Sequence, residues 1–335
     1  MRHLFQALDA HVAGASVRLI TGGLPRLSGT SLQRRQASLI RQAGAVRRAL
    51  ILEPRGHRDL VGAVLTDTQT AGADAGLLFM DADGWPLVNG AATMAAAALA
   101  CQRGLIVKPA SEQGHMRVDF DTLAGTVGVD VTARPEQSVV DVTLTTVPAF
   151  VACPGAEARV WGRTVRVDLA YAGAFYAMLD TEAVGIPLEP SRLGELRRLG
   201  VDLVRALSGH EALTHPVDHA RVDVAAVVFT GAPQQTDAHL RSVTITAGGA
   251  YDRSPNPDGT AAVMAILDEM GLLDPQQTFV HENLLGAVQR ARIERRSQVA
   301  QTPALIVQVD GQVWMTGEHT FVVDDDDPFR DGFVL

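Results

Sequence analysis

The chain has 335 residues, of which 47% are hydrophobic and 20% are charged, and its formal net charge is −9. This composition is typical of a soluble globular protein, and the length allows two cores, because single cores stop growing near roughly 250–300 residues. The acidic balance argues against nucleic acid as a partner, and no run of about 18 apolar residues predicts a membrane span. The first residues lack a signal-peptide pattern, so we expect a cytoplasmic protein.

The first eighty residues predict strands around one helix. Residues 3–25 read as a strand, a tight loop over residues 9–14 and a second strand. From Thr30 the apolar spacing becomes helical, which predicts a helix over 30–48 with arginines on its outer faces. Further strands are expected at 50–53, 61–65 and 76–80.

An alanine-rich helix is predicted from Gly90 to about Cys101. It has almost no polar residue, so we expect other elements to surround it on all sides. Strands are then predicted at residues 116–120, 125–131, 139–144, 165–170, 173–176, 222–229, 241–247, 305–309, 312–315 and 321–323, with an amphipathic helix over 191–207.

Two stretches, 88–95 and 251–262, share a pattern. Each has an asparagine, a threonine four residues later and an alanine-containing helix, and Asn89 and Asn256 lie 167 positions apart, about half the chain. We infer an internal repeat of two similar half-molecules. Each half offers a helix N-terminus, whose N–H groups and positive end suit an anionic ligand.

Several motifs together resemble the proline racemase family, within the diaminopimelate-epimerase-like fold. In chain order they are Asp9-Ala10-His11-Val12-Ala13-Gly14 with Arg18, Gly22 and Gly23; Leu52-Glu53-Pro54-Arg55-Gly56-His57; Ala73 to Met80; Gly173-Ala174-Phe175-Tyr176; Asp252-Arg253-Ser254-Pro255; and the tail from Thr316-Gly317 to Gly332-Phe333. The Glu-Pro-Arg-Gly-His and Asp-Arg-Ser-Pro runs, in this order, are highly specific.

The resemblance implies an α/β fold with two pseudo-symmetric halves, each a curled β-sheet around a central helix, and a site in the interdomain cleft. We expect the halves at 1–163 and 164–313, with C-terminal strands at 314–335 that in this fold return to the first half. The family implies isomerase chemistry on small amino or imino acids without a cofactor. The sequence leaves a homodimer open.

The family's racemases and epimerases use two cysteines, one per half, as thiolate base and thiol acid on opposite faces of the substrate Cα. The matching positions here hold Asn89 and Asn256, and Ala91 replaces a histidine. Pro257-Asp258 replaces a Gly-Thr pair. Asp252, whose family counterpart lies beside the substrate's ring nitrogen, still matches.

These departures change the expected chemistry. An amide is neither a base nor an acid near neutral pH, so we predict that two-thiol racemase or epimerase chemistry is absent. Pro257 removes one N–H from the anion site, and Asp258 adds a carboxylate where a substrate carboxylate would approach. Candidate catalytic residues are Asp258 and Asp252. Candidate substrate-binding residues are Asn89, Gly90, Ala91, Asp252, Asn256, Gly259 and Thr260.

Structural interpretations of the same residues stay open. Asn89 and Asn256 could simply be N-caps, and Asp258 a helix-start carboxylate stabilised by the helix dipole. Asp252 could hold a turn. The protein is then either a family enzyme with changed acid–base groups, a non-catalytic amino-acid or imino-acid binder, or a lyase or isomerase with a different substrate.

Other reactive residues point to no further site. Cys101 and Cys153 lie in an expected helix and an expected Pro-Gly turn, so we predict no disulfide. Lys108, the single lysine, would have to form any pyridoxal-phosphate Schiff base, which its loop setting disfavours. His11 and His57 lie in expected loops. The histidines at 210, 215 and 219 lack a convincing zinc-ligand spacing, so no metal or cofactor is expected.

Overall fold

The structure is a computed structural model that describes the whole chain except residues 113, 134–138, 275 and 335. The helices are α1 (Leu32–Ile51), α2 (Gly90–Gln102), α3 (Leu193–Leu207) and α4 (Pro257–Glu269), with 3₁₀ turns η1 (Thr181–Val184) and η2 (Pro190–Arg192). The strands are β1 (Arg2–Val12), β2 (Ala15–Gly22), β3 (Val61–Thr66), β4 (Ala75–Met80), β5 (His115–Thr122), β6 (Gly125–Ala133), β7 (Val139–Thr145), β8 (Ala149–Val160), β9 (Arg163–Ala172), β10 (Phe175–Asp180), β11 (Val224–Gly231), β12 (Leu240–Thr246), β13 (Phe279–Asn283), β14 (Val288–Val299) and β15 (Thr302–Asp324).

The chain divides into two compact units. Unit 1 comprises Met1–Leu144 and Gly311–Leu335, and unit 2 comprises Thr145–Asp310. The first boundary, expected after residue 163, follows residue 144 in the structure, because β8 pairs along its length with β9 in unit 2. The C-terminal segment lies in unit 1, where the last part of β15 pairs with β1.

The topology repeats between the units. In unit 1 the chain passes from β2 through α1 to a parallel β3, and from β4 through α2 to a parallel β5. In unit 2 it passes from β10 through α3 to a parallel β11, and from β12 through α4 to a parallel β13. The predicted α/β class with two pseudo-symmetric halves is therefore confirmed.

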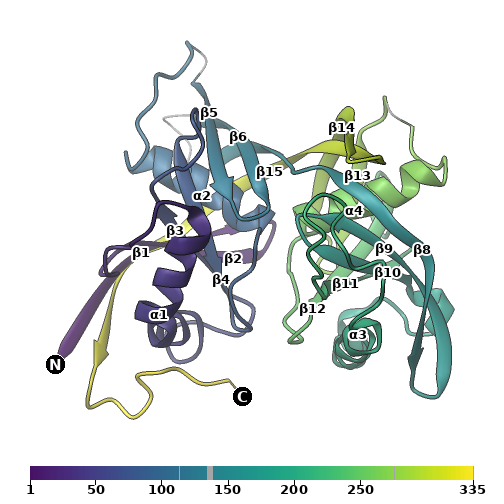
Figure 1. The fold of residues 1–335 in the computed structure, drawn as a ribbon, viewed down its shortest axis with the longest axis horizontal. Helices are drawn as coiled ribbons and strands as arrows, with labels where there is room; N and C mark the ends of the chain where they lie inside the picture. Colours follow the sequence, from purple (N-terminus) through teal and green to yellow (C-terminus); the bar gives the residue numbers. More distant parts are fainter. Residues whose placement is uncertain (113, 134–138, 275, 335) are drawn as a thin grey trace. The chain divides into compact units, whose positions relative to one another are not determined.

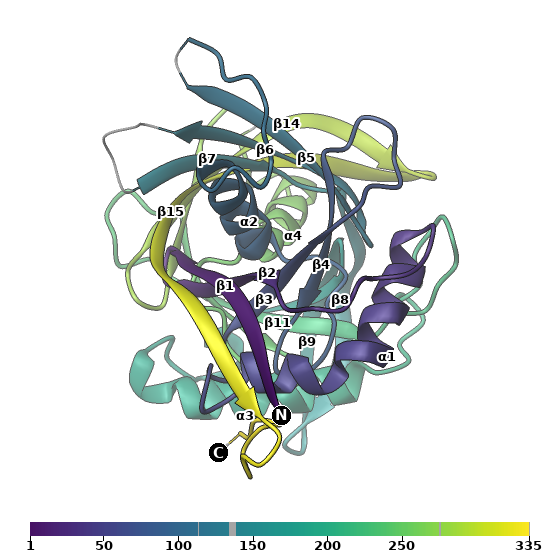
Figure 2. The same ribbon diagram turned by 90° about the vertical axis from the view of Figure 1, so that its left-hand side faces the viewer.

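In each unit one short helix is packed among the strands. Helix α2 packs against β1, β2, β3 and β6 (Figure 2), and α4 packs against β8, β9 and β10. Residues 90–100 of α2 are all buried, as its alanine-rich, apolar sequence predicts. The other two helices cover the opposite faces of the strands: Leu39 and Leu50 of α1 join the outer core of unit 1, and Leu196, Leu199 and Leu203 of α3 join that of unit 2 (Figure 1).

Some predicted elements were wrong. Residues 50–53 are not a strand, because α1 runs to Ile51 and the buried face that includes Leu39 and Ala43 continues to Leu50. The predicted loop at residues 9–14 is shorter in the structure: residues 9–12 belong to β1, which has a bulge between Asp9 and Ala10 where it pairs with β15, and only residues 13–14 connect it to β2. Cys153 lies within β8 rather than in a turn. The strand accommodates the neighbouring Pro-Gly pair through irregularities on both sides of Cys153, with Gly155 at a positive φ of 64°.

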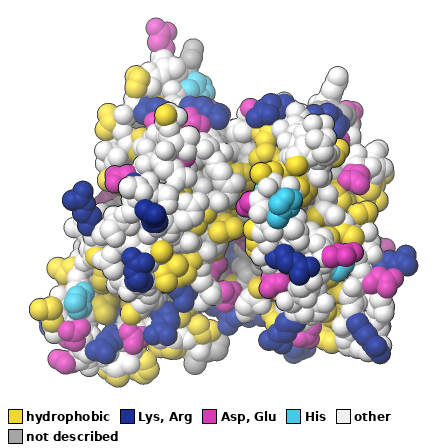
Figure 3. Space-filling model, viewed as in Figure 1, with side chains coloured by type: hydrophobic (Ala, Val, Ile, Leu, Met, Phe, Trp, Pro, Cys, Tyr) yellow, Lys and Arg dark blue, Asp and Glu magenta, His cyan; other side chains and the backbone are white. Residues whose placement is uncertain are grey.

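Two features of the structure bear on the expectations from composition: the distribution of surface charge and the hydropathy of the helices. Basic and acidic side chains are interspersed over the face shown in Figure 3, whereas nucleic-acid binding uses contiguous basic surface. None of the helices in the described part of the chain has the length and hydropathy required to cross a membrane.

Candidate functional site

The first turn of α4 is organised by Asn256. This residue has φ 60° and ψ 102°, and its Oδ1 accepts the N–H of Gly259 at 2.7 Å. Its backbone carbonyl accepts the N–H of Thr260 at 2.7 Å. Asn256 is therefore the N-cap of α4, which confirms the capping interpretation.

Asp252 holds the same turn from the preceding segment. Its Oδ1 accepts the backbone N–H of Ser254 at 2.7 Å and the Ser254 hydroxyl at 2.8 Å, and its Oδ2 accepts Nδ2 of Asn256 at 3.0 Å. Burial raises the pKa of the Asp252 carboxyl above its ordinary value, and the hydrogen bonds from Ser254 and Asn256 oppose that rise. The side-chain amide of Asn256 thus joins Asp252 to the start of the helix.

Asp258 lies one residue after Pro257 in the first turn of α4 and is 4% exposed. Tyr176 of β10 is close enough to be affected by this carboxylate. The pKa of the Tyr176 phenol is raised well above its ordinary value, first by burial and then by the charges of Asp258 and Asp252. The structure therefore brings the two predicted catalytic carboxylates near one buried phenol that sequence reasoning did not single out.

Thr260 connects α4 to β13. Its side chain is fully buried, and its Oγ1 lies 2.8 Å from Nδ1 of His281 and 3.3 Å from the carbonyl oxygen of Pro255. Burial lowers the pKa of His281 to about 3, so its imidazole is neutral near pH 7. Sequence reasoning missed His281, because a single histidine in a short strand carries no signal of a partner 21 residues away.

The matching turn in unit 1 is simpler. Asn89 is the N-cap of α2, and its Oδ1 accepts the N–H of Ala92 at 2.9 Å. Its carbonyl accepts the N–H of Thr93 at 2.9 Å and the Thr93 hydroxyl at 2.8 Å. The first turn of α2 contains no acidic residue, and Gly90 and Ala91 are buried within it. The two turns share the cap but differ in charge.

We predict that the two asparagines contribute unequally to stability. Asn256→Ala removes the cap and the hydrogen bond to Asp252, and it places alanine at positive φ, so the free energy of unfolding should fall by about 2–4 kcal/mol. Asn89→Ala removes a cap alone and should cost about 1 kcal/mol. Urea denaturation measures both. Asn256→Gly, which tolerates the backbone angle, should fall between them, and equal costs for the two alanine variants would contradict this account.

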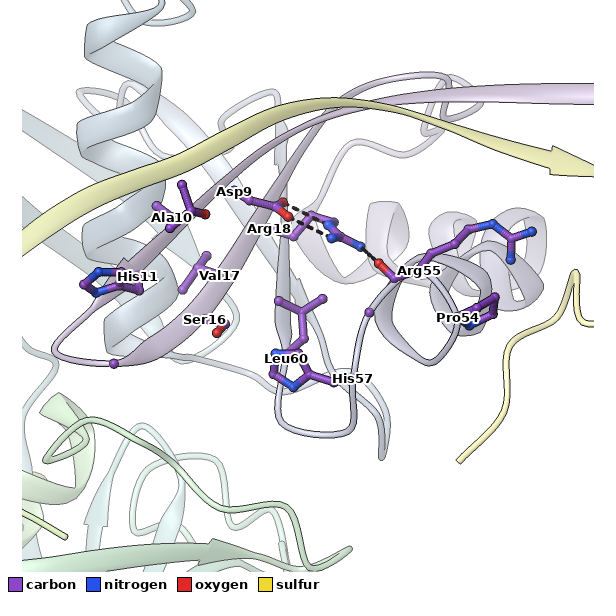
Figure 4. A pocket seen from close by; sticks show the side chains of 13 residues that line it. Asp9, Ala10, His11, Ser16, Val17, Arg18, Pro54, Arg55, His57 and Leu60 are labelled. Carbon is purple, nitrogen blue, oxygen red and sulfur yellow. Dashed lines mark hydrogen bonds and ion pairs between the residues drawn. The ribbon is translucent and has the colours of Figure 1, made fainter. Parts of the chain in front are cut away.

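A cavity of about 470 Å³ in unit 1 is lined by residues 9–11, 14, 16–18, 54–57 and 60, most of them from two of the sequence motifs, and by Thr316 (Figure 4). At one side, Arg18 donates to both carboxylate oxygens of Asp9 at 2.9 and 2.7 Å and to the carbonyl of Arg55 at 2.7 Å. The Arg55 side chain points away from the cavity and donates to Asp327 at 2.6 Å. These charged motif residues therefore hold strands and loops together.

The remaining candidates from the sequence form no second reactive centre. Lys108 donates to Asp74 at 2.8 Å. Cys101 and Cys153 are free thiols in different units, and burial raises the pKa of Cys101. Among the residues that the structure describes, no three His, Cys, Asp or Glu side chains gather into a group that could hold a metal ion. His11 lies on β1, and His57 follows α1 in a turn where its Nδ1 accepts the N–H of Asp59 at 3.2 Å.

Two repeated units, each with a helix buried among strands and capped at its first turn, define a two-unit α/β protein. The family model described as Proline racemase matches residues 7–334. The chain belongs to the proline racemase family, as its motifs predicted.

Individual relatives cover nearly the whole chain. The chain is 32% identical to a proline racemase of Clostridioides difficile over 331 residues, with 98% of each chain covered. It is 34% identical to a probable 4-hydroxyproline 2-epimerase of Rhizobium meliloti over 336 residues, with 99% of each covered. A crystal structure of a hydroxyproline epimerase from Agrobacterium vitis with bound trans-4-hydroxy-L-proline has a TM-score of 0.89 and 28% identity, covering 99% of this chain and 95% of that one.

Proposed function

We propose that this protein binds proline, hydroxyproline or a related small amino or imino acid and does not carry out two-thiol racemisation. The observation that carries the proposal is the position of Asn89 and Asn256: both amides cap helices at the motif positions where the family resemblance places cysteines. An amide does not exchange a Cα proton near neutral pH. The relative from Agrobacterium vitis holds trans-4-hydroxy-L-proline, which supports this ligand class.

The proposed ligand contacts lie at the two helix starts. They are Asn89, Gly90 and Ala91 at α2 and Asp252, Asn256, Gly259 and Thr260 at α4. Helix N-termini suit carboxylates, and α2 keeps an uncharged first turn. The proposal needs no metal or cofactor. The cytoplasmic location stays a prediction.

A second candidate is an isomerase or lyase that uses carboxylates in place of thiols. The burial of Asp258 and the raised pKa of Asp252 favour it, since a base needs a pKa moved toward the working pH. In that case Asp258 or Asp252 would take the Cα proton. Loss of a measured activity in Asp258→Asn with an unchanged thermal midpoint would support Asp258 as the base, and full activity would remove it.

Proton exchange tests the proposal directly. The protein is incubated in deuterium oxide with L-proline, D-proline and the 4- and 3-hydroxyprolines, and loss of the α-proton signal is followed by NMR. We expect no exchange above the protein-free rate, and we expect ligand-induced thermal stabilisation by at least one of these compounds. Exchange at rates typical of enzymes, about 1 s⁻¹ or more, would overturn the absence of racemase-type chemistry. No stabilisation by any of them would overturn the ligand class.

A further inference from the structure

Three side chains of unit 2 have buried polar atoms without a hydrogen-bond partner among the described residues. These atoms are Oγ of Ser242, Nε2 of His281, and both Nε2 and Oε1 of Gln289. Ser242 is 1% exposed, His281 is fully buried and Gln289 is 3% exposed. Folded proteins rarely bury polar groups without partners, and ordered water commonly supplies the partner that the protein lacks.

The three side chains lie on one face of the sheet, on the side of α4. His281 of β13 is 2.8 Å from Thr260 of α4, so it projects to that side. Gln289 of β14 is the antiparallel partner of His281, and such partners share a face, with Cβ atoms about 4.5–5.5 Å apart. Ser242 lies on the neighbouring strand β12. Because the next residue, Val243, lies in the core that α3 covers, Ser242 also projects toward α4.

The contacts of Thr260 assign the ring proton of His281 to Nδ1. The Thr260 hydroxyl donates its one proton to the carbonyl of Pro255 at 3.3 Å, because a carbonyl oxygen only accepts. The contact of 2.8 Å between Thr260 Oγ1 and His281 is then donated by Nδ1. Burial lowers the pKa of His281 to about 3, so the imidazole is neutral near pH 7 and has no second proton. Its Nε2 is therefore an acceptor that requires a donor.

A water molecule matches the groups around this acceptor. Gln289 does not supply the donor directly, because its amide forms no hydrogen bond within the described chain. The amide offers two N–H donors and a carbonyl acceptor, and the Ser242 hydroxyl both donates and accepts. A buried water makes about three hydrogen bonds, which these groups provide. All three side chains are uncharged near pH 7, so a neutral ligand suits the cluster better than an ion.

We propose that Ser242, His281 and Gln289 bind ordered water inside unit 2, which joins β12, β13 and β14 on the side of α4. The water donates to Nε2 of His281 and is held by the Gln289 amide and the Ser242 hydroxyl. Through the contact between His281 and Thr260, this hydrated cluster supports the first turn of α4 from the sheet. The inference is independent of the proposed ligand class, since none of the three residues is a proposed ligand contact.

A double-mutant cycle tests whether two of these side chains share a water. Gln289→Met and Ser242→Ala each remove one partner of the water without adding bulk, and each should lower the thermal midpoint by about 2–4 °C. Because both changes affect the same water, the double variant should fall by less than the sum of the two shifts. The control Gln298→Met, at an exposed position on the same strand, should leave the midpoint unchanged.

Two results of the cycle would overturn the inference. Additive shifts for Gln289→Met and Ser242→Ala would mean that the two side chains hold no common water. A higher midpoint for Gln289→Met would mean that the amide is buried without any partner, since its removal then relieves a cost and loses no bond.

A high-resolution crystal structure of the wild-type chain gives the direct result and does not depend on whether a variant folds. We expect at least one ordered water within about 3.2 Å of both Nε2 of His281 and the Gln289 amide. A direct hydrogen bond between Gln289 and His281 without a water would overturn the inference. An anomalous peak at this position in crystals grown with thallium(I) would also overturn it, because the ligand would then be a monovalent cation.

Discussion

Replacing Arg241 with methionine is expected to lower the free energy of unfolding by about 3–5 kcal/mol. Arg241 is 4% exposed and Glu282 is fully buried, and Nε of Arg241 lies 3.6 Å from Oε1 of Glu282. The guanidinium also donates to the carbonyls of Leu188 at 3.0 Å and Leu284 at 2.9 Å. Removing it leaves a buried carboxylate without its counter-ion and two carbonyls without a donor, and both consequences destabilise the folded state.

The variant series distinguishes charge from packing. Glu282 accepts the N–H groups of Gln234 and Gln235 at 2.7 and 3.0 Å, so a neutral amide at this position would keep its shape but lose its charge. Adding Glu282→Gln to Arg241→Met should therefore recover part of the lost stability in urea denaturation. Arg290→Met, which removes an exposed partner of Asp237, should cost less than about 1 kcal/mol. A cost below that limit for Arg241→Met would show that the buried pair is not required.

Strand β13 connects this ion pair to the candidate site. Glu282 and His281 are adjacent on that strand, and His281 contacts Thr260 in the first turn of α4. The loop before β12, held by Glu282, and the start of α4 are thus fixed by neighbouring residues of a single buried strand. Loosening β13 should therefore lower stability and also weaken binding of the proposed ligand at α4.

The parts of the site that the sequence predicted are those with local causes. An N-cap joins residues three positions apart, so the capping role of Asn89 and Asn256 could be predicted from their position before the helices. The alanine-rich composition of α2 likewise predicted its burial. Motifs added the family and the repeat, which no periodicity would have provided.

The parts that the sequence did not predict depend on contacts between distant segments. Tyr176, Ser242 and His281 come from three different strands, and strand alternation assigns each a face only once its neighbours are known. The end of α1 was misassigned for a different reason: a short apolar run such as Leu50-Ile51-Leu52 fits either a strand or the end of a buried helix. The faces of these three strand residues and the end of α1 both depend on burial by residues that are distant in the sequence.

His281 should make stability fall as the pH is lowered. Burial lowers its pKa in the folded state to about 3, whereas an unfolded histidine titrates near roughly 6.5. Between these values the unfolded chain binds a proton that the folded chain does not, so its contribution is complete above about pH 6.5 and is lost as the pH falls toward 3. Between about pH 6.5 and 4.5 the loss should be about 2 kcal/mol.

Chemical denaturation of the wild type and of His281→Gln at several pH values tests this contribution. The variant lacks the titrating group, so the wild-type free energy of unfolding should fall by about 2 kcal/mol relative to the variant across this window, while the exposed His219→Gln should parallel the wild type. Parallel curves for wild type and His281→Gln would mean that folding does not lower the pKa of His281, so that its imidazole becomes charged in the folded state as the pH falls below about 6.5. A charged imidazole beside Thr260 would then alter the electrostatics of the first turn of α4, where the proposed ligand contacts of unit 2 lie.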